Sequence, residues 1–203
     1  MTLFTLLRST GSVLALAVTV AAWQPDSLEA QAADLVSQAR QALDADRIDD
    51  AIALLEKGVS AEPKNPAVLA WLGSAQVRKA GKVPPMEAGG WVKRGFDTLD
   101  EAAERFPDAF VVYAMRGITA VRVPDLFRKT DVAVKDLSTV VAMKERAPQS
   151  VPDGVMPGVY LNLGLAQKKA GRPADARTTW EKGKQLYPAA PEAAAFDREL
   201  KAL

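Results

Sequence analysis

The chemistry open to this chain is that of carboxylates and cations. The 203 residues include 25 Asp and Glu, 26 Lys and Arg, and neither cysteine nor histidine. A chain without these two residue types has no thiol nucleophile, histidine base or disulfide, and it lacks the ligands of the common zinc sites. What remains is acid–base work by paired carboxylates, cation binding by carboxylates, and binding of anionic partners by Lys and Arg.

Four aspartates between positions 44 and 50 raise the question of a calcium-binding loop. The spacing does not fit, because the loop glycine is missing, Ile48 stands at a ligand position, and Leu55 stands where a bidentate glutamate is needed. No metal site is therefore predicted, and no cofactor is expected. The aspartates are Asp44, Asp46, Asp49 and Asp50.

A catalytic site is not marked out either. No two carboxylates stand in the apolar setting that acid–base catalysis uses. The Gly89-Gly90 pair follows no strand, so it does not predict a phosphate-binding loop. A non-catalytic protein is expected, with a carboxylate-dependent hydrolase as the alternative, because glycosidase-type carboxylate pairs leave little trace in a sequence.

The elements that must position these side chains are helices. Alanine is frequent, β-branched runs are short and no stretch alternates with a period of two, so the predicted class is all-α. Residues 160–170 and 173–188 predict two amphipathic helices that are separated at Gly171. Pro173 fits the first turn of the second helix, and Pro188 ends it.

Small residues in this helix pair allow the two axes to approach closely, and Gly164 is predicted to lie where the helices touch. A single hairpin cannot bury its apolar side, so neighbouring hairpins are expected. The pattern resembles the tetratricopeptide repeat (TPR), a helix-turn-helix unit of about 34 residues. The residues that carry the resemblance are Tyr160, Leu163, Gly164, Ala176, Trp180, Gly183 and Pro188.

The resemblance extends over residues 32–188 and implies about four repeats, the second and third interrupted by insertions. Residues 191–203 predict one more helix, whose apolar stripe suits a cap over the last hairpin. The predicted fold of residues 32–203 is therefore all-α: tandem antiparallel helix hairpins in a TPR-like α-solenoid, with a C-terminal capping helix.

In this family the first helices of successive repeats line a concave groove that binds an extended peptide or a partner helix. The resemblance implies a groove in which basic residues recur beside apolar ones, which suits a protein or peptide partner with acidic residues. The asparagines with which family members clamp a terminal carboxylate are missing. The implied groove residues are Arg40, Val77, Arg78, Ile118, Arg122, Leu165, Lys168 and Lys169.

A second explanation applies to most of these cations. Arg78, Arg122, Lys168 and Lys169 fall in the last turns of their predicted helices, where the helix dipole favours a positive charge whatever the protein binds. Arg40 lies in the middle of its helix, so it discriminates better between the two explanations.

The charge distribution argues against nucleic acid as a partner. The net charge is +1; residues 24–62 carry nine acids against three bases, and residues 63–203 carry sixteen acids against twenty-two bases. This excess is too small for the dense basic stripe of a nucleic-acid-binding surface.

The insertion over residues 82–93 is predicted to form a loop, because Pro84-Pro85 and Gly89-Gly90 break the helical pattern. Trp91 in this loop is either a contact residue for a partner or a side chain that staples the loop to a neighbouring helix. Docking through this loop, as a structural subunit of an envelope complex, is the alternative to binding in the groove.

The N-terminal residues predict export. Residues 1–22 contain a short apolar run that ends in small residues, which is typical of a cleaved secretory signal, and residues 23–31 read as a polar linker. The alternative is an uncleaved N-terminal anchor. The first reading predicts a periplasmic protein; the second predicts a membrane-anchored protein that faces away from the cytoplasm.

Overall fold

The structure is a computed structural model that describes residues 25–203, with side chains from residue 33 onward. Over this range the chain forms nine α-helices and three short 3-10 helices and no strand. The predicted signal segment, residues 1–22, lies outside the described residues. The elements are α1 (Pro25–Asp44), α2 (Ile48–Ala61), α3 (Pro66–Lys79), η1 (Ala80–Lys82), α4 (Pro85–Arg105), α5 (Phe110–Arg122), η2 (Asp125–Phe127), α6 (Thr130–Arg146), η3 (Asp153–Val155), α7 (Met156–Lys169), α8 (Pro173–Leu186) and α9 (Ala193–Lys201).

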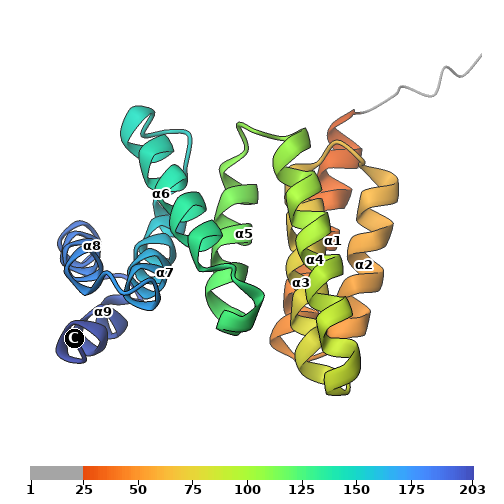
Figure 1. Cartoon of the computed structure of the whole chain (residues 1–203). Coiled ribbons are helices and arrows are strands. Elements are labelled where there is room, and N and C mark those ends of the chain that lie inside the picture. Colours follow the sequence, from red (N-terminus) through yellow and green to blue (C-terminus); the bar gives the residue numbers. More distant parts are fainter. Residues whose placement is uncertain (1–24) are drawn as a thin grey trace, which may run out of the picture.

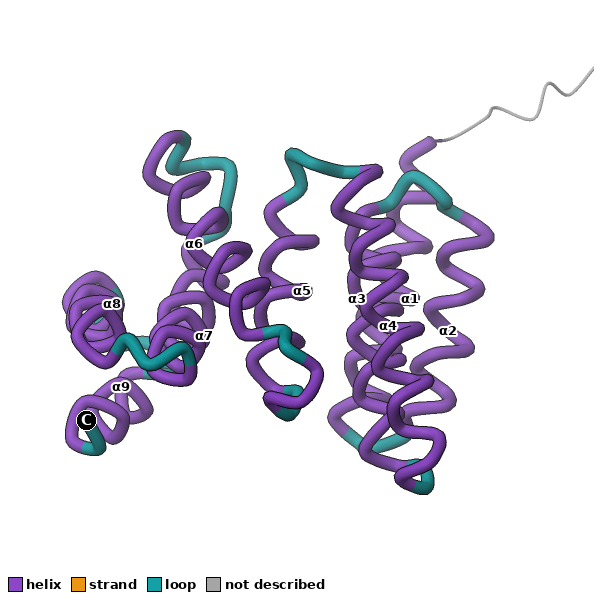
Figure 2. Tube along the Cα trace, in the orientation of Figure 1, coloured by secondary structure: helices purple, strands orange, loops and turns teal. Residues whose placement is uncertain are grey.

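Consecutive helices pair into four antiparallel hairpins: α1 with α2, α3 with α4, α5 with α6, and α7 with α8. The helix α9 packs against α8 and α7, as the predicted capping helix should. In Figure 1 the hairpins follow one another along the molecule, with α1–α4 gathered at one end and α9 at the other. Figure 2 shows that only short connections separate the helices. The predicted all-α array of tandem hairpins is confirmed.

The first and last hairpins close with the same turn. Asp46 and Gly171 have positive φ angles of 60° and 73°, the left-handed conformation that often ends a helix. The residue after each of them donates its N–H, at 2.8 Å, to the helix carbonyl five positions earlier. Two turns 125 positions apart in the chain thus have the same backbone geometry, as expected of equivalent positions in two repeats.

The prediction that Gly164 lies at a helix contact is confirmed. A Cβ atom at this position would collide with the indole of Trp180 on α8. Trp180 is fully buried and donates its Nε1–H to the carbonyl oxygen of Leu161 at 3.0 Å. The indole therefore fills the space between α7 and α8 without leaving a buried donor unpaired.

The prediction of a loop over residues 82–93 is wrong. The 3-10 helix η1 ends at Lys82, and α4 begins at Pro85 and continues to Arg105. The two prolines stand immediately before the helix and in its first turn, where a missing N–H costs nothing. The insertion therefore lengthens the second hairpin at its turn end.

The glycine pair in this segment does not interrupt α4. Gly89 and Gly90 are exposed, and each costs about 1 kcal/mol relative to alanine in a helix. Burial of Val92 and Phe96, one and two turns further on, outweighs that cost. Tertiary packing thus overrides the local preference on which the loop prediction depended.

The predicted linker is also shorter than expected, because α1 begins at Pro25 and residues 25–31 belong to this helix. Proline suits the first turn of a helix, as it does in α4 and α8. Within residues 25–203, no helix has the length and apolar character needed to cross a membrane.

Candidate binding site

Two of the predicted groove cations bind the ends of neighbouring helices. Arg78 on α3 donates a hydrogen bond from Nη2 to the carbonyl oxygen of Leu43 in the last turn of α1, at 2.9 Å. Lys169 on α7 donates from Nζ to the carbonyl oxygen of Val123, just after α5, at 2.6 Å, and pairs with Asp125 at 2.9 Å. Carbonyl groups at a helix end lack partners within the helix, so both cations satisfy and neutralise the end of the preceding repeat's first helix.

Lys168 and Arg40 make different contacts. The Nζ of Lys168 lies 3.4 Å from a carboxylate oxygen of Glu199, so it links α7 to α9. The guanidinium of Arg40 lies 5.3 Å from the centre of the Trp71 ring, between the first helices of repeats one and two. Arg40 is exposed, so this cation–π contact contributes only about 0.5–1 kcal/mol and leaves its N–H groups accessible.

Arg122, at the end of α5, differs from the other cations. Among residues 33–203 it has no ion pair and no side-chain hydrogen bond. Loss of solvation around part of the side chain, followed by the positive charge of Arg78, lowers the pKa of the Arg122 guanidinium. The structure thus holds two arginines close enough to repel each other without a carboxylate between them.

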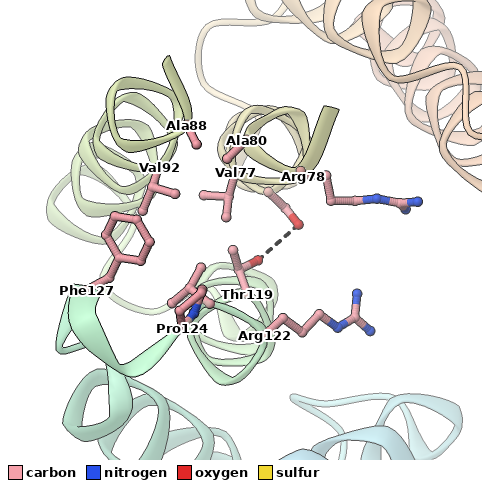
Figure 3. Close-up of a pocket in the computed structure, with 12 residues that line it drawn as sticks. Val77, Arg78, Ala80, Ala88, Val92, Thr119, Arg122, Pro124 and Phe127 are labelled. Atoms are coloured by element: carbon pink, nitrogen blue, oxygen red, sulfur yellow. Dashed lines mark hydrogen bonds between the residues drawn. The ribbon is translucent and has the colours of Figure 1, made fainter. Parts of the chain in front are cut away.

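The two arginines border a pocket of about 330 Å³ between α3, η1 and α4 on one side and α5 and η2 on the other. Of the predicted site residues, Val77, Arg78 and Arg122 line this pocket. Figure 3 shows the apolar side chains gathered around its interior and both arginine side chains extending to the same side. The lining residues are Ser74, Val77, Arg78, Ala80, Gly81, Ala88, Val92, Thr119, Arg122, Val123, Pro124 and Phe127.

The interior of the pocket is apolar. Its two hydroxyl groups, on the buried residues Ser74 and Thr119, form a hydrogen bond with each other at 3.0 Å (Figure 3). This bond leaves little unmet hydrogen-bonding demand inside the pocket. Valine, alanine, proline and phenylalanine side chains form most of the remaining wall, so the interior favours an apolar ligand group.

Both insertions in the repeat pattern contribute walls to the pocket. The lengthened hairpin provides Ala80, Ala88 and Val92, and the η2 connector of the next repeat provides Pro124 and Phe127. Sequence reasoning missed these residues as site residues. The available signal was that two adjacent repeats both depart from the 34-residue period, and inserts in repeat arrays often form the binding face.

The remaining predicted contact residues lie outside the pocket. Trp91 is half-buried against the core of the first two hairpins, and the guanidinium of Arg94 lies 4.8 Å from the centre of its ring. Ile118 and Leu165 are half-buried against the core formed by α5–α9. None of the three joins the arginine pair.

Three of the four aspartates considered for metal binding form ion pairs, and one of these is Asp50, which pairs with Arg47 at 3.2 Å. Asp46 pairs with Lys82 and Asp49 with Lys79, both at 2.5 Å. In the described part of the chain, no group of three or more acidic residues has the arrangement of a metal site.

The fully buried carboxylate of Asp136 is likewise paired. It accepts hydrogen bonds from Arg116 Nε at 2.6 Å and Nη2 at 3.0 Å, and Arg116 Nη1 binds Asp100 at 2.9 Å. This bridge joins α5 to α6 and α4. A carboxylate held by two N–H groups of one guanidinium suits a structural role better than that of a general acid.

Comparison with known proteins supports the repeat geometry. No protein-family model matches the sequence, and no curated protein matches it. A thermophilic TPR protein from Thermus thermophilus has a similar structure, with a TM-score of 0.68 and 17% identity over 82% of this chain and 80% of that chain.

Two structures of MamA are also similar. A mutant of MamA has a TM-score of 0.50 and 23% identity over 86% of this chain and 98% of that chain. A second structure, MamA MSR-1, has a TM-score of 0.51 and 22% identity over 84% of this chain and 95% of that chain. At such identities the likeness shows the fold, and together with the four hairpins it confirms a TPR-like array of tandem helix hairpins.

Proposed function

We propose that this protein is a non-catalytic protein–protein interaction scaffold of the cell envelope, and that it binds a partner segment on the surface formed by its first helices, centred on the pocket between α3 and α5. One observation carries the proposal. The pocket combines an apolar interior with Arg78 and Arg122, neither of which forms an ion pair within residues 33–203. A partner segment with a carboxylate would supply the missing counter-charge.

The chemistry of the pocket supports binding rather than catalysis. Its lining contains no carboxylate that could act as a general base, and its two hydroxyl groups are bonded to each other. A hydrolase would need a base close to the ligand. A TPR-type array of first helices, in contrast, presents an extended surface to a peptide.

Photo-crosslinking to native envelope proteins tests the proposed surface. A crosslinking amino acid at position 88, inside the pocket, should capture a discrete partner. The same group at Lys57, an exposed residue of α2 that contributes nothing to the pocket, should not. Capture only from Lys57 would refute binding through the pocket.

A second candidate is docking through the start of α4, as a subunit of an envelope complex. The observation in its favour is that Met86, in the first turn of this helix, is 98% exposed. Crosslinking from position 86 without crosslinking from position 88 would support this alternative.

The proposed envelope location is supported by the N-terminal sequence alone. The expected mature protein begins at or near Trp23, because the preceding apolar run is short and ends in small residues. N-terminal sequencing of the native protein tests this expectation. Met1 retained on membrane-bound protein would replace cleavage with anchoring, and Met1 retained on cytoplasmic protein would refute export.

A further inference from the structure

We propose that the pocket between α3 and α5 receives one aromatic side chain of the partner, and that a carboxylate next to this side chain binds between Arg78 and Arg122. This inference rests on the proposed function and states what the surface recognises.

The size and lining of the pocket point to a single large side chain. Its volume of about 330 Å³ lies at the small end of the ~300–1,000 Å³ range of ligand pockets. Val77, Val92 and Phe127 surround it, and the Ser74–Thr119 hydrogen bond needs no partner from a ligand. An aromatic ring gains contact area in such a site at a low cost in conformational entropy.

The arginine pair points to a carboxylate beside that ring. Both side chains extend to the same side of the pocket (Figure 3). Arg78 commits Nη2 to the carbonyl of Leu43, which leaves its other N–H groups for a ligand, and Arg122 has no hydrogen-bond acceptor within residues 33–203. A carboxylate between them replaces repulsion between like charges with two charge-assisted contacts.

In the fourth repeat, the cation at the position equivalent to Arg78 and Arg122 has both a carbonyl and a carboxylate as partners. Lys169 lies five residues after Gly164, as Arg78 lies five after Gly73 and Arg122 five after Gly117. Lys169 binds both a helix-end carbonyl and the carboxylate of Asp125. Arg78, at the α1–α3 junction, binds only a carbonyl. Arg122, at the α3–α5 junction, binds neither a carbonyl nor a carboxylate of residues 33–203, so both arginines lack the carboxylate that Lys169 has.

The segments that form the pocket walls also present apolar side chains to solvent. Within the described part of the chain, four large hydrophobic side chains are exposed, and the two most exposed are Met86 on α4 and Leu126 on η2, at 98% and 75%. Both belong to the inserted segments that build the walls. A partner segment that seats its aromatic side chain can therefore bury further apolar surface nearby.

Synthetic peptides test the inference without knowledge of the partner. The probe is a nine-residue glycine- and serine-based peptide with a central phenylalanine flanked by two glutamates, acetylated and amidated at its ends. It should bind saturably to the purified full-length protein. Replacing its phenylalanine with alanine, or both glutamates with glutamine, should each weaken binding by at least about tenfold. A version with glutamines and a free C-terminus shows whether a terminal carboxylate can replace the side-chain carboxylate.

Two protein variants locate the binding. Arg122→Glu should weaken binding at least about tenfold, because it places a negative charge where the carboxylate binds. Arg122 is chosen because Arg78 also stabilises the end of α1. Ala88→Phe should fill the pocket and weaken the phenylalanine peptide while leaving the weak alanine peptide unchanged. Circular dichroism and thermal unfolding check that both variants fold.

Arg177→Glu is the matched control, since it makes the same charge change at an exposed position of α8 outside the pocket. An equal loss in Arg177→Glu and Arg122→Glu would show non-specific attraction and overturn the inference. Equal affinity for the phenylalanine and alanine peptides, or no saturable binding at millimolar concentration, would also overturn it. If the native partner still crosslinks to position 88 in these cases, the proposed function stands and only the inference fails; crosslinking elsewhere refutes the proposed function.

Discussion

At the scale of single residues, the contact between Gly164 and Trp180 sets how closely α7 and α8 approach. A methyl group at position 164 would overlap the indole, which is fully buried and held by its hydrogen bond to Leu161. Gly164→Ala is expected to lower the free energy of unfolding by about 1–3 kcal/mol, the usual cost of overpacking. Urea unfolding of the purified protein measures the change.

Gly90→Ala is the matched control, because Gly90 is also helical but has open space where a Cβ would lie. The same substitution there should raise stability by about 0.4–1 kcal/mol through the unfolded chain. If both variants were stabilised equally, the close contact between α7 and α8 would be incorrect.

Tyr160 makes the stability of this same helix pair sensitive to alkaline pH. Burial is the main cause that raises the pKa of the Tyr160 hydroxyl above its ordinary value near 10, and the nearby Lys182 partly opposes it. Because the folded state holds this proton more tightly than the unfolded state, the contribution is present below pH 10 and is lost as the pH rises above it. The raised pKa of Lys182, caused mainly by its hydrogen bond to Glu145, acts in the same direction.

Tyr160→Phe is therefore expected to reduce the loss of stability between about pH 9 and pH 11. Urea unfolding at a series of pH values tests this, and the variant's own stability at pH 7 corrects for the missing hydroxyl. An unchanged pH dependence would mean that Tyr160 ionises equally easily in both states.

At the scale of helices, the ion pair between Arg116 and Asp136 joins α5 to α6 inside the third hairpin. The Asp136 side chain is fully buried, and the hydrogen bond with this carboxylate is the main cause that raises the pKa of Arg116. Asp136→Ala should destabilise the protein by about 3–5 kcal/mol, because the guanidinium would lose its buried partner. Thermal unfolding monitored by circular dichroism measures the effect.

Asp100→Ala removes the second carboxylate of the same arginine and is the control. The Asp100 side chain is 49% exposed, so its loss should cost only about 0–1 kcal/mol. Similar costs for the two variants would show that burial does not set the strength of this bridge.

At the scale of the whole molecule, stability should be local, because each hairpin contacts only its neighbours. Phe196 on α9 is fully buried and packs where α8 carries Gly183. Phe196→Ala should cost about 3–5 kcal/mol and speed amide hydrogen exchange in α7–α9 while α1–α3 stay protected. Hydrogen-exchange mass spectrometry gives the map, and uniform acceleration along the chain would indicate one cooperative unit instead.

The fold class and the hairpin order could be predicted from the sequence. Apolar periodicity, the prolines that begin helices and the small residues at helix contacts act within one helix or one hairpin, so they can be read without the tertiary structure. The Gly164–Trp180 contact is the clearest case, since both residues belong to one hairpin. The same local rules wrongly predicted a loop over residues 82–93. In the structure, burial of Val92 and Phe96 keeps this glycine-containing segment helical from Pro85 onward.

Which cations are already paired within the protein could be seen only in the tertiary structure. Arg78 and Arg122 are 44 positions apart, and Val92 and Phe127 are 35 apart, yet all four line one pocket. Their meeting depends on how the second and third hairpins pack and on the two insertions, whose residues form part of the pocket wall. The same packing brings Lys169 to the carbonyl of Val123 and leaves Arg122 without a carboxylate among the described residues. A sequence pattern shows which side chains lie on one face of each helix. The distances between helices determine which of the charged side chains form ion pairs within the protein.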